Sequence, residues 1–260
     1  MDKNILQKML SFIPVEEGQA ILEIGAGQGV LTRLLAKKKV ELFAVEIDKQ
    51  LALLLEEEFK DNTNVKVIQA DILGFDIKNF SQKLKRPLIV VGNIPYYITS
   101  PIIEKLFLAR DCIKDIFLTV QKEFAQRMQA IPGSRLYGAF SCFVQYYSNP
   151  KILFTIKRSC FFPVPKVDSC FVHLKPVQKK WQTAINEDNL FFIIRQAFQQ
   201  RRKMLKNSLK KVVPEETLDE FFKQEKLSSS IRAEQVSLEQ FICLLGMLNQ
   251  EKINIVNHHK

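Results

Sequence analysis

Apolar and polar positions in the first two thirds of the chain alternate between two periods. Five short apolar runs have the length and composition of buried strands, at residues 20–24, 42–47, 65–70, 88–91 and 116–120. Helical periodicity precedes them at residues 5–13 and continues between and after them near 29–38, 49–59, 100–109 and 122–129. Strands separated by helices of this length predict a parallel sheet that is covered on both faces.

The pattern changes in the last third of the chain. After a helical stretch near 135–147, strand-like runs at 151–156 and 170–174 predict a closing strand pair at the sheet edge. Only helical patterns follow, near 188–210, 215–225 and 237–248. We therefore predict an α/β domain over residues 1–176, with a mostly parallel seven-stranded sheet, and a small all-helical domain over residues 177–260.

A glycine-rich turn follows the first predicted strand, in the sequence Glu23-Ile24-Gly25-Ala26-Gly27-Gln28-Gly29. Glycines at this position allow the backbone to approach a ligand closely. A dinucleotide-binding turn has its third glycine at the sixth position, where this chain has Val30. The turn therefore favours a compact ligand without a pyrophosphate.

Acidic residues end the next two predicted strands. Glu46 precedes Ile47 about 20 residues after the glycines, where a carboxylate can accept hydrogen bonds from ribose hydroxyls, and Asp71 precedes Ile72. Either acid alone is equally consistent with a helix cap or a solvated strand end. The ordered set predicts a ligand site at the carboxyl edge of the sheet: Gly25, Gly27, Glu46, Asp71 and Asn93.

A tight turn with unusual chemistry follows the fourth predicted strand. Asn93 offers a side-chain oxygen, and Ile94 offers a carbonyl that Pro95 holds in extended geometry. Two such acceptors can draw the lone pair of a planar amine out of conjugation, and Tyr96 adds a face for stacking. A plain strand-ending turn is the alternative. The turn indicates in-line alkylation of an amine such as adenine N6, and no general base is evident.

Composition and charge limit the kinds of partner that the protein is expected to bind. The 260 residues carry a net charge of +10, with a pI near 9.3, which favours a polyanionic partner. The five cysteines have no Cys-x-x-Cys spacing, and the three histidines are not part of a cluster of possible metal ligands. The sequence therefore predicts no metal site. No signal-peptide layout and no apolar run of about 18 residues are present, so we expect a cytoplasmic protein with no membrane contact.

Taken in order, these residues resemble the motifs of S-adenosylmethionine-dependent methyltransferases. Two further segments, Phe161-x-Pro163-x-Pro165-Lys166-Val167-Asp168-Ser169 and Gln196-Ala197-Phe198-x-x-Arg201-Arg202-Lys203-x-Leu205-x-Asn207-Ser208-Leu209, resemble the KsgA (RsmA) family of small-subunit rRNA adenine dimethyltransferases. The resemblance covers nearly the whole chain. It implies a Rossmann-like class I methyltransferase fold and N6,N6-dimethylation of two adjacent adenines near the 3′ end of small-subunit (16S) rRNA. The expected partner is this rRNA within an immature 30S-type particle, and the expected state is a metal-free monomer.

The resemblance also implies roles for single residues. Gly25 and Gly27 would flank the methionine portion of S-adenosylmethionine, Glu46 would hold its ribose and Asp71 would meet its adenine. Asn93 would bridge the cofactor and the target amine. The implied cofactor set is Glu23, Gly25, Gly27, Glu46, Ile47, Asp71, Ile72 and Asn93, and the implied catalytic set is Asn93, Ile94, Pro95, Tyr96 and Phe161. Tyr96 and Phe161 would contact a flipped adenine, although core packing is the alternative for Phe161.

A basic stretch in the helical region is the candidate RNA contact. Its six cations are Arg201, Arg202, Lys203, Lys206, Lys210 and Lys211, with no acid between them. Phe198, Leu205 and Leu209 would dock one face of a single helix and leave the cations for backbone phosphates. A solvated helix face is the alternative.

The sequence departs from the family at its start. A Gly-Gln-x-Phe-Leu-like motif usually precedes the first helix, and here Met1-Asp2-Lys3-Asn4-Ile5 begins where that motif would end. A late start assignment or a truncated chain would explain this, with weaker cofactor affinity as the expected result. Three other functions remain open: an Erm-type large-subunit rRNA dimethyltransferase, a protein-glutamine methyltransferase, and a ribosome-assembly factor with incidental methylation. The Arg232–Glu239 segment favours the small-subunit function over the Erm type, and Ile94 argues against the glutamine enzyme.

Overall fold

The computed structural model describes residues 2–177, 185–200 and 202–250. They form two compact units. The sheet unit comprises Met1–Ala125 and Tyr147–Gln178, and the helical unit comprises Gln126–Tyr146 and Lys179–Lys260. The segment 126–146 thus groups with the later helices, so the units are not divided at a single point of the chain. The predicted boundary at 176/177 stays a prediction.

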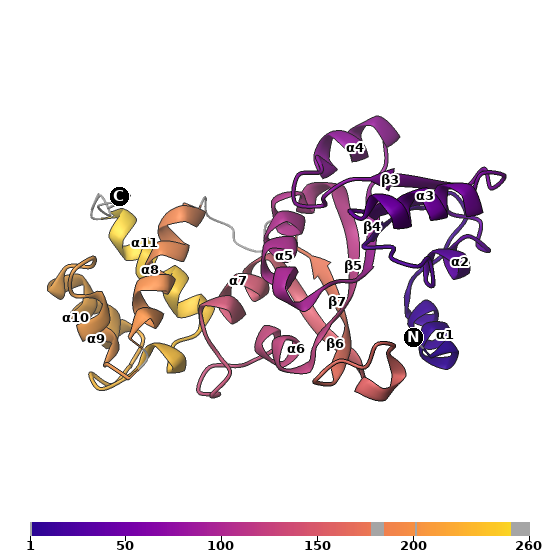
Figure 1. The fold of residues 1–260 in the computed structure, drawn as a ribbon. Coiled ribbons are helices and arrows are strands. Elements are labelled where there is room, and N and C mark those ends of the chain that lie inside the picture. The colour runs from indigo at the N-terminus through magenta and orange to yellow at the C-terminus, as the bar shows by residue number, and fades with distance from the viewer. Residues whose placement is uncertain (1, 178–184, 201, 251–260) are drawn as a thin grey trace. The chain divides into compact units, whose positions relative to one another are not determined.

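Seven strands form one sheet in the order β3-β2-β1-β4-β5-β7-β6 (Figure 1). Strands β1 to β5 run parallel, and β7 runs antiparallel to both of its neighbours. The bounds are β1 Ala20–Ile24, β2 Glu41–Glu46, β3 Val65–Gln69, β4 Leu88–Asn93, β5 Ile113–Gln121, β6 Ser148–Ile156 and β7 Ser169–Pro176. The predicted Rossmann-like, mostly parallel sheet is confirmed. Its strand order reverses at β1 and β4, where open α/β sheets bind ligands.

Helices flank this sheet (Figure 1). Their bounds are α1 Lys3–Phe12, α2 Thr32–Leu35, α3 Lys49–Glu58, α4 Ile77–Leu84 and α5 Thr99–Leu108, with short 3-10 turns at η1 Tyr96–Ile98, η2 Arg110–Cys112 and η3 Arg158–Cys160. Helix α6 Lys122–Met128 begins in the sheet unit and ends in the helical unit, and α7 Ala139–Tyr147 belongs to the helical unit except for its last residue. The helix expected near 29–38 is only four residues long, because the glycine turn still occupies the first positions. Helix α4 was not predicted; the Asp76 side chain caps it by accepting a hydrogen bond from the Asn79 amide at 3.0 Å.

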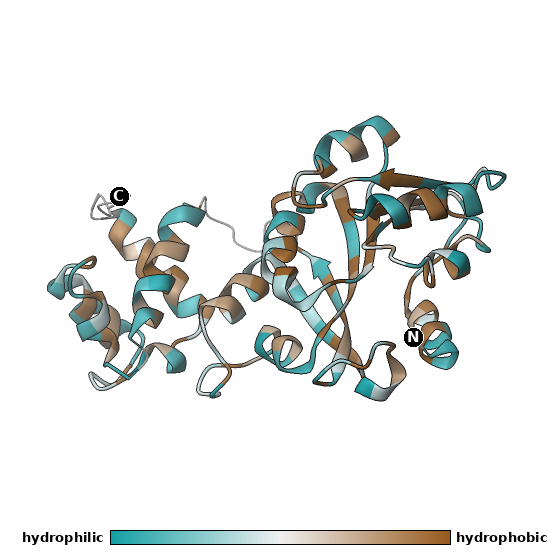
Figure 2. Cartoon of the chain, in the orientation of Figure 1, coloured by the Kyte–Doolittle hydropathy of each residue, from teal (hydrophilic) through white to brown (hydrophobic). Residues whose placement is uncertain are grey.

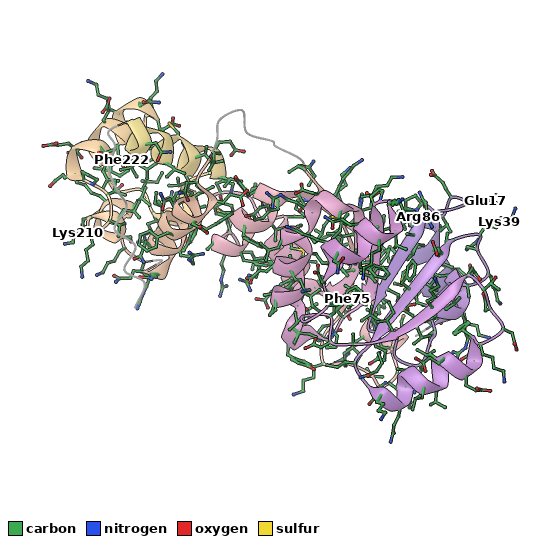
Figure 3. All side chains as sticks on the ribbon, turned by 90° about the horizontal axis from the view of Figure 1, so that it is seen from above. Glu17, Lys39, Phe75, Arg86, Lys210 and Phe222 are labelled. Carbon is green, nitrogen blue, oxygen red and sulfur yellow. The ribbon has the colours of Figure 1, made fainter. Side chains whose placement is uncertain are left out.

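The central strands are apolar on both faces. All side chains of β1 are buried, and so are five of the six in β2. Figure 2 shows hydrophobic residues, in brown, along the neighbouring strand β4, which Figure 1 labels. At the amino ends of the strands, Arg86 donates hydrogen bonds to the Gly18 carbonyl and to the Glu41 carboxylate. Arg86, labelled in Figure 3, therefore joins three chain segments at the edge opposite the carboxyl ends.

The later part of the helical unit contains α8 Glu187–Gln199, α9 Leu205–Leu209, α10 Glu215–Gln224, η4 Ala233–Gln235 and α11 Leu238–Gln250. Leu190, Phe221 and Phe241 are fully buried. The prediction of one helix over 188–210 is wrong. Between α8 and α9 the chain pairs with a distant segment: Met204 forms a β-bridge with Arg232, and the Leu205 amide donates to the Ile231 carbonyl at 2.8 Å. Among the described residues, no helix is long and apolar enough to cross a membrane.

Candidate active site

A cavity of about 540 Å³ opens at the carboxyl ends of the parallel strands in the sheet unit. This volume is typical of a small-molecule site. Ten of the predicted cofactor and catalytic residues line it: Glu23, Gly25, Gly27, Glu46, Ile47, Asp71, Ile72, Asn93, Pro95 and Phe161. The other two, Ile94 and Tyr96, are in the same turn as Asn93 but not in the cavity wall.

The Glu46 carboxylate shapes the glycine turn. Its Oε2 accepts a hydrogen bond from the Gly27 amide at 2.7 Å, and its Oε1 accepts one from the Asp48 amide at 2.9 Å. Gly27 has φ +56°, a conformation that side chains disfavour. Glu46 is buried, and each of its oxygens has a second lone pair that can accept a ligand hydroxyl. The acid therefore positions the loop as well as facing the cavity.

Glu23 is a buried carboxylic acid in the cavity wall. It is 2% exposed, and its Oε2 has no hydrogen-bond partner among the described residues. Burial raises the pKa of Glu23 to about 8; the nearby Glu46 adds to the rise, and the polar groups of Thr32 partly oppose it. An unpartnered buried oxygen requires an explanation, and a ligand with an ammonium group would supply the missing donor. The residue therefore fits a cofactor with an amino-acid portion.

Ile47, Asp71 and Ile72 also line the cavity. Ile47, directly after β2, is 63% exposed, and Ile72 is buried. Asp71 uses Oδ1 to accept a hydrogen bond from the Leu73 amide at 2.9 Å, and its second oxygen can accept from an amino group. An apolar side chain can pack on a flat ring, and a carboxylate oxygen can accept a hydrogen bond from an amino group on that ring.

The Asn93 turn is rigidly held. Asn93 ends β4 beside Thr119 of β5, and its side chain is exposed, whereas Ile94 is only 2% exposed. The Pro95 carbonyl accepts hydrogen bonds from the Ile98 amide at 3.2 Å and from the Thr99 hydroxyl at 3.3 Å. These hydrogen bonds fix the turn to the start of α5, so the backbone that carries Asn93 is held in place beside the cavity.

The Asn93 turn and the Phe161–Ser169 segment are joined in space. The Tyr96 hydroxyl lies 2.7 Å from Ser169 Oγ, although 73 residues separate them. Ser169 is fully buried at the start of β7. This hydrogen bond holds the Tyr96 ring in one orientation. A base that stacks on Tyr96 would therefore meet a ring that is already in place.

Several wall residues were not predicted. Leu6 and Met9 of α1 line the cavity, as do Tyr97 and Phe162. Only the amphipathic face of α1 hinted at the first two. Tyr97 and Phe162 adjoin predicted residues in the sequence, but their exposure could not be known from the sequence.

The basic stretch is divided by the break between α8 and α9. Lys206 pairs with Glu215 at 2.9 Å and with Asp219 at 2.7 Å, so its charge is already neutralised. The other described cations of the stretch are exposed: Arg202, Lys203, Lys210 and Lys211. Figure 3 shows Lys210 at the surface of the helical unit. Arg201 lies outside the described residues. Within the part of the chain that the structure describes, no group of His, Cys, Asp or Glu could hold a metal ion.

The chain is similar to proteins of one named family. A family model described as ribosomal RNA adenine dimethylase matches residues 1–250. The protein named ribosomal RNA small subunit methyltransferase A from Lachnoclostridium phytofermentans is 39% identical over 258 residues, covering 96% of this chain and 89% of that protein. The protein of the same name from Clostridioides difficile is 39% identical over 254 residues, covering 96% of this chain and 88% of that protein.

Solved structures also resemble the chain. A dimethyladenosine transferase from Plasmodium falciparum matches with a TM-score of 0.79 and 25% identity, covering 98% of both chains. The 23S rRNA methyltransferase ErmE matches with a TM-score of 0.76 and 24% identity, covering 96% of this chain and 99% of that one. The second similarity shows a shared fold alone.

Proposed function

The chain belongs to the ribosomal RNA adenine dimethylase family, and we propose that it transfers methyl groups from S-adenosylmethionine to N6 of two adjacent adenines near the 3′ end of small-subunit rRNA. The observation that carries the proposal is the Asn93 turn in the wall of a cavity of about 540 Å³ that Glu23, Glu46 and Asp71 also line. The names of the curated relatives favour the small subunit over the large-subunit substrate of an Erm-type enzyme.

The cofactor supplies an electrophilic methyl group on a sulfonium. Gly25 and Gly27 would allow its methionine portion to lie against the backbone, and Glu23, in the same cavity wall, would face the ammonium group. Glu46 would accept hydrogen bonds from the ribose, and Ile47 and Asp71 would hold the adenine. Several acceptors in one cavity wall would fix the orientation of the cofactor before the RNA arrives, so that the reacting atoms are aligned.

Asn93 and Ile94 act on the target amine. The Asn93 side-chain oxygen and the Ile94 carbonyl would accept hydrogen bonds from the amine N–H groups, which favours the lone pair on nitrogen and stabilises the developing positive charge. Because the Pro95 carbonyl accepts hydrogen bonds from Ile98 and Thr99, these acceptors need little rearrangement.

Phe161 borders the cavity and offers a face to a base that has left its stack. Exposed cations of the helical unit, such as Lys203 and Lys210, contact backbone phosphates of the immature particle.

A transfer assay tests this function. The protein is incubated with labelled S-adenosylmethionine and undermethylated small ribosomal subunits, with large-subunit RNA alongside, and the products are identified by mass spectrometry of nucleosides. We expect N6,N6-dimethyladenosine in small-subunit RNA only. Label in large-subunit RNA would favour the Erm-type function, and no label would contradict the proposal. Asn93→Ala should lose most transfer while its fold stays intact; near-normal turnover would refute its role.

A further inference from the structure

Two aromatic side chains at the mouth of the cavity are almost fully exposed. Phe162 is 93% exposed and Tyr97 is 85% exposed. Both line the cavity that also contains Asn93 and Phe161. An aromatic side chain carries about 150–250 Å² of surface, and leaving that surface in water forgoes a large stabilisation. Exposed aromatic residues at the rim of one cavity indicate a surface that binds a partner.

From this arrangement we propose that Tyr97 and Phe162 stack on the nucleobase next to the target adenine. The proposal rests on the proposed function, because it needs a target adenine in the cavity beside Asn93. Once that base has entered the cavity, its neighbour along the strand must lie at the rim. Sequence-tolerant binders of single strands use aromatic faces in this way. Where the two targets are adjacent, the stacked neighbour is the second adenine.

The surroundings of Phe162 favour a nucleic acid over a protein partner. The loop at residues 157–166 carries Lys157, Arg158 and Lys166 and no acid. All three cations are exposed. A base on the aromatic faces would place its phosphates beside positive charges, the combination that single-strand grooves provide.

Tyr97 and its neighbour Tyr96 differ in how their side chains are held. The Tyr96 hydroxyl is held by Ser169 at 2.7 Å, whereas the Tyr97 ring lies in the cavity wall and is open to solvent. Replacing Tyr97 therefore removes an exposed face without disturbing the core. The same holds for Phe162, so alanine variants at both positions should fold.

Steady-state kinetics on undermethylated small subunits test the proposal. The variants are Tyr97→Ala, Phe162→Ala and the double variant. We expect each single change to raise KM by about 5-fold or more, as expected for the loss of one stacking contact, with affinity for S-adenosylmethionine unchanged. The double variant should also release more RNA in which only one of the two adenines is dimethylated.

Tyr97→Phe and Phe162→Tyr are conservative controls: they keep a stacking face and should keep KM near the wild-type value. Leu108→Ala is the matched control, because Leu108 is 67% exposed in the sheet unit and does not line the cavity.

A binding measurement separates this proposal from the proposed function. A short single-stranded RNA with 2-aminopurine beside the target adenine should lose fluorescence on binding the wild-type protein and less on binding the double variant. This readout needs no methyl transfer. Normal methylation by the double variant with an unchanged KM would overturn the stacking role while the function stands. A lower kcat with an unchanged KM would also overturn it, as would equal quenching by both proteins.

Discussion

Replacing the buried Glu23 by Gln should change how stability depends on pH. Below pH 4.5 the acid is neutral in the folded and the unfolded chain. Above pH 4.5 the unfolded chain ionises while the folded chain, with a pKa of about 8, keeps its proton. The wild-type protein therefore loses stability as pH rises from about 4.5 to about 8, and the loss is constant above that range.

The size of the effect follows from the two pKa values. Each pH unit in the window is worth about 1.4 kcal/mol, so the wild-type protein should lose roughly 3 kcal/mol relative to Glu23→Gln between pH 4.5 and pH 7, and roughly 5 kcal/mol by pH 8. Gln has nearly the same shape and no charge. Any cost of its amide is independent of pH, so the slope of the difference reports the acid alone.

Urea unfolding at pH 5, 6, 7, 8 and 9 measures this difference. The free energy of unfolding of Glu23→Gln minus that of the wild type should rise up to pH 8 and then level off. Glu104→Gln, on the exposed surface of α5, is the control and should show no such rise. A difference that stays flat between pH 5 and pH 8 would show that Glu23 is not held in its protonated form.

Three further changes test other contacts. Gly92→Ala should destabilise the protein by about 1–3 kcal/mol in thermal unfolding, because the added Cβ would lie 2.9 Å from a backbone oxygen; unchanged stability would mean that the strands separate easily. Tyr96→Phe and Ser169→Ala should each cost about 0.5–1.5 kcal/mol, and the double variant should cost little more than either one, which a double-mutant cycle checks. Lys210→Gln should weaken small-subunit RNA binding and reduce the dependence of log affinity on log salt by about 0.7–0.9, whereas Lys206→Gln, already paired with two acids, should leave that slope unchanged; equal effects would contradict the assignment.

The fold could be predicted because each strand is recognisable from its own short stretch of sequence. The runs at 20–24 and 65–70 are apolar, short and bounded by turns, and the structure places strands there within one residue at each end. The break after α8 could not be predicted in this way. It depends on the pairing of Met204 with Arg232, a contact between segments that are distant in the chain, and helical periodicity continues through it.

The cavity could be predicted from strand ends for a similar reason. Parallel strands bring their carboxyl ends to one edge, so Glu46, Asp71 and Asn93 had to lie together. What the sequence could not reveal is the state of each side chain. The double hydrogen bond of Glu46, the missing partner of Glu23 and the exposure of Tyr97 all depend on how the loops fold over the sheet.

The reversed direction of β7 is what brings the second motif to the site. β7 pairs antiparallel with β5, with Ser169 opposite Gln121, so its first residue meets the carboxyl end of its neighbour. The loop with Phe161 and Phe162 precedes that residue and therefore lies at the active edge. A parallel β7 would place this loop at the opposite edge, and a register shift of one residue would turn Ser169 to the other face, away from Tyr96. The antiparallel edge of the sheet is thus a requirement of the site, because it joins two motifs that are 73 residues apart in the chain.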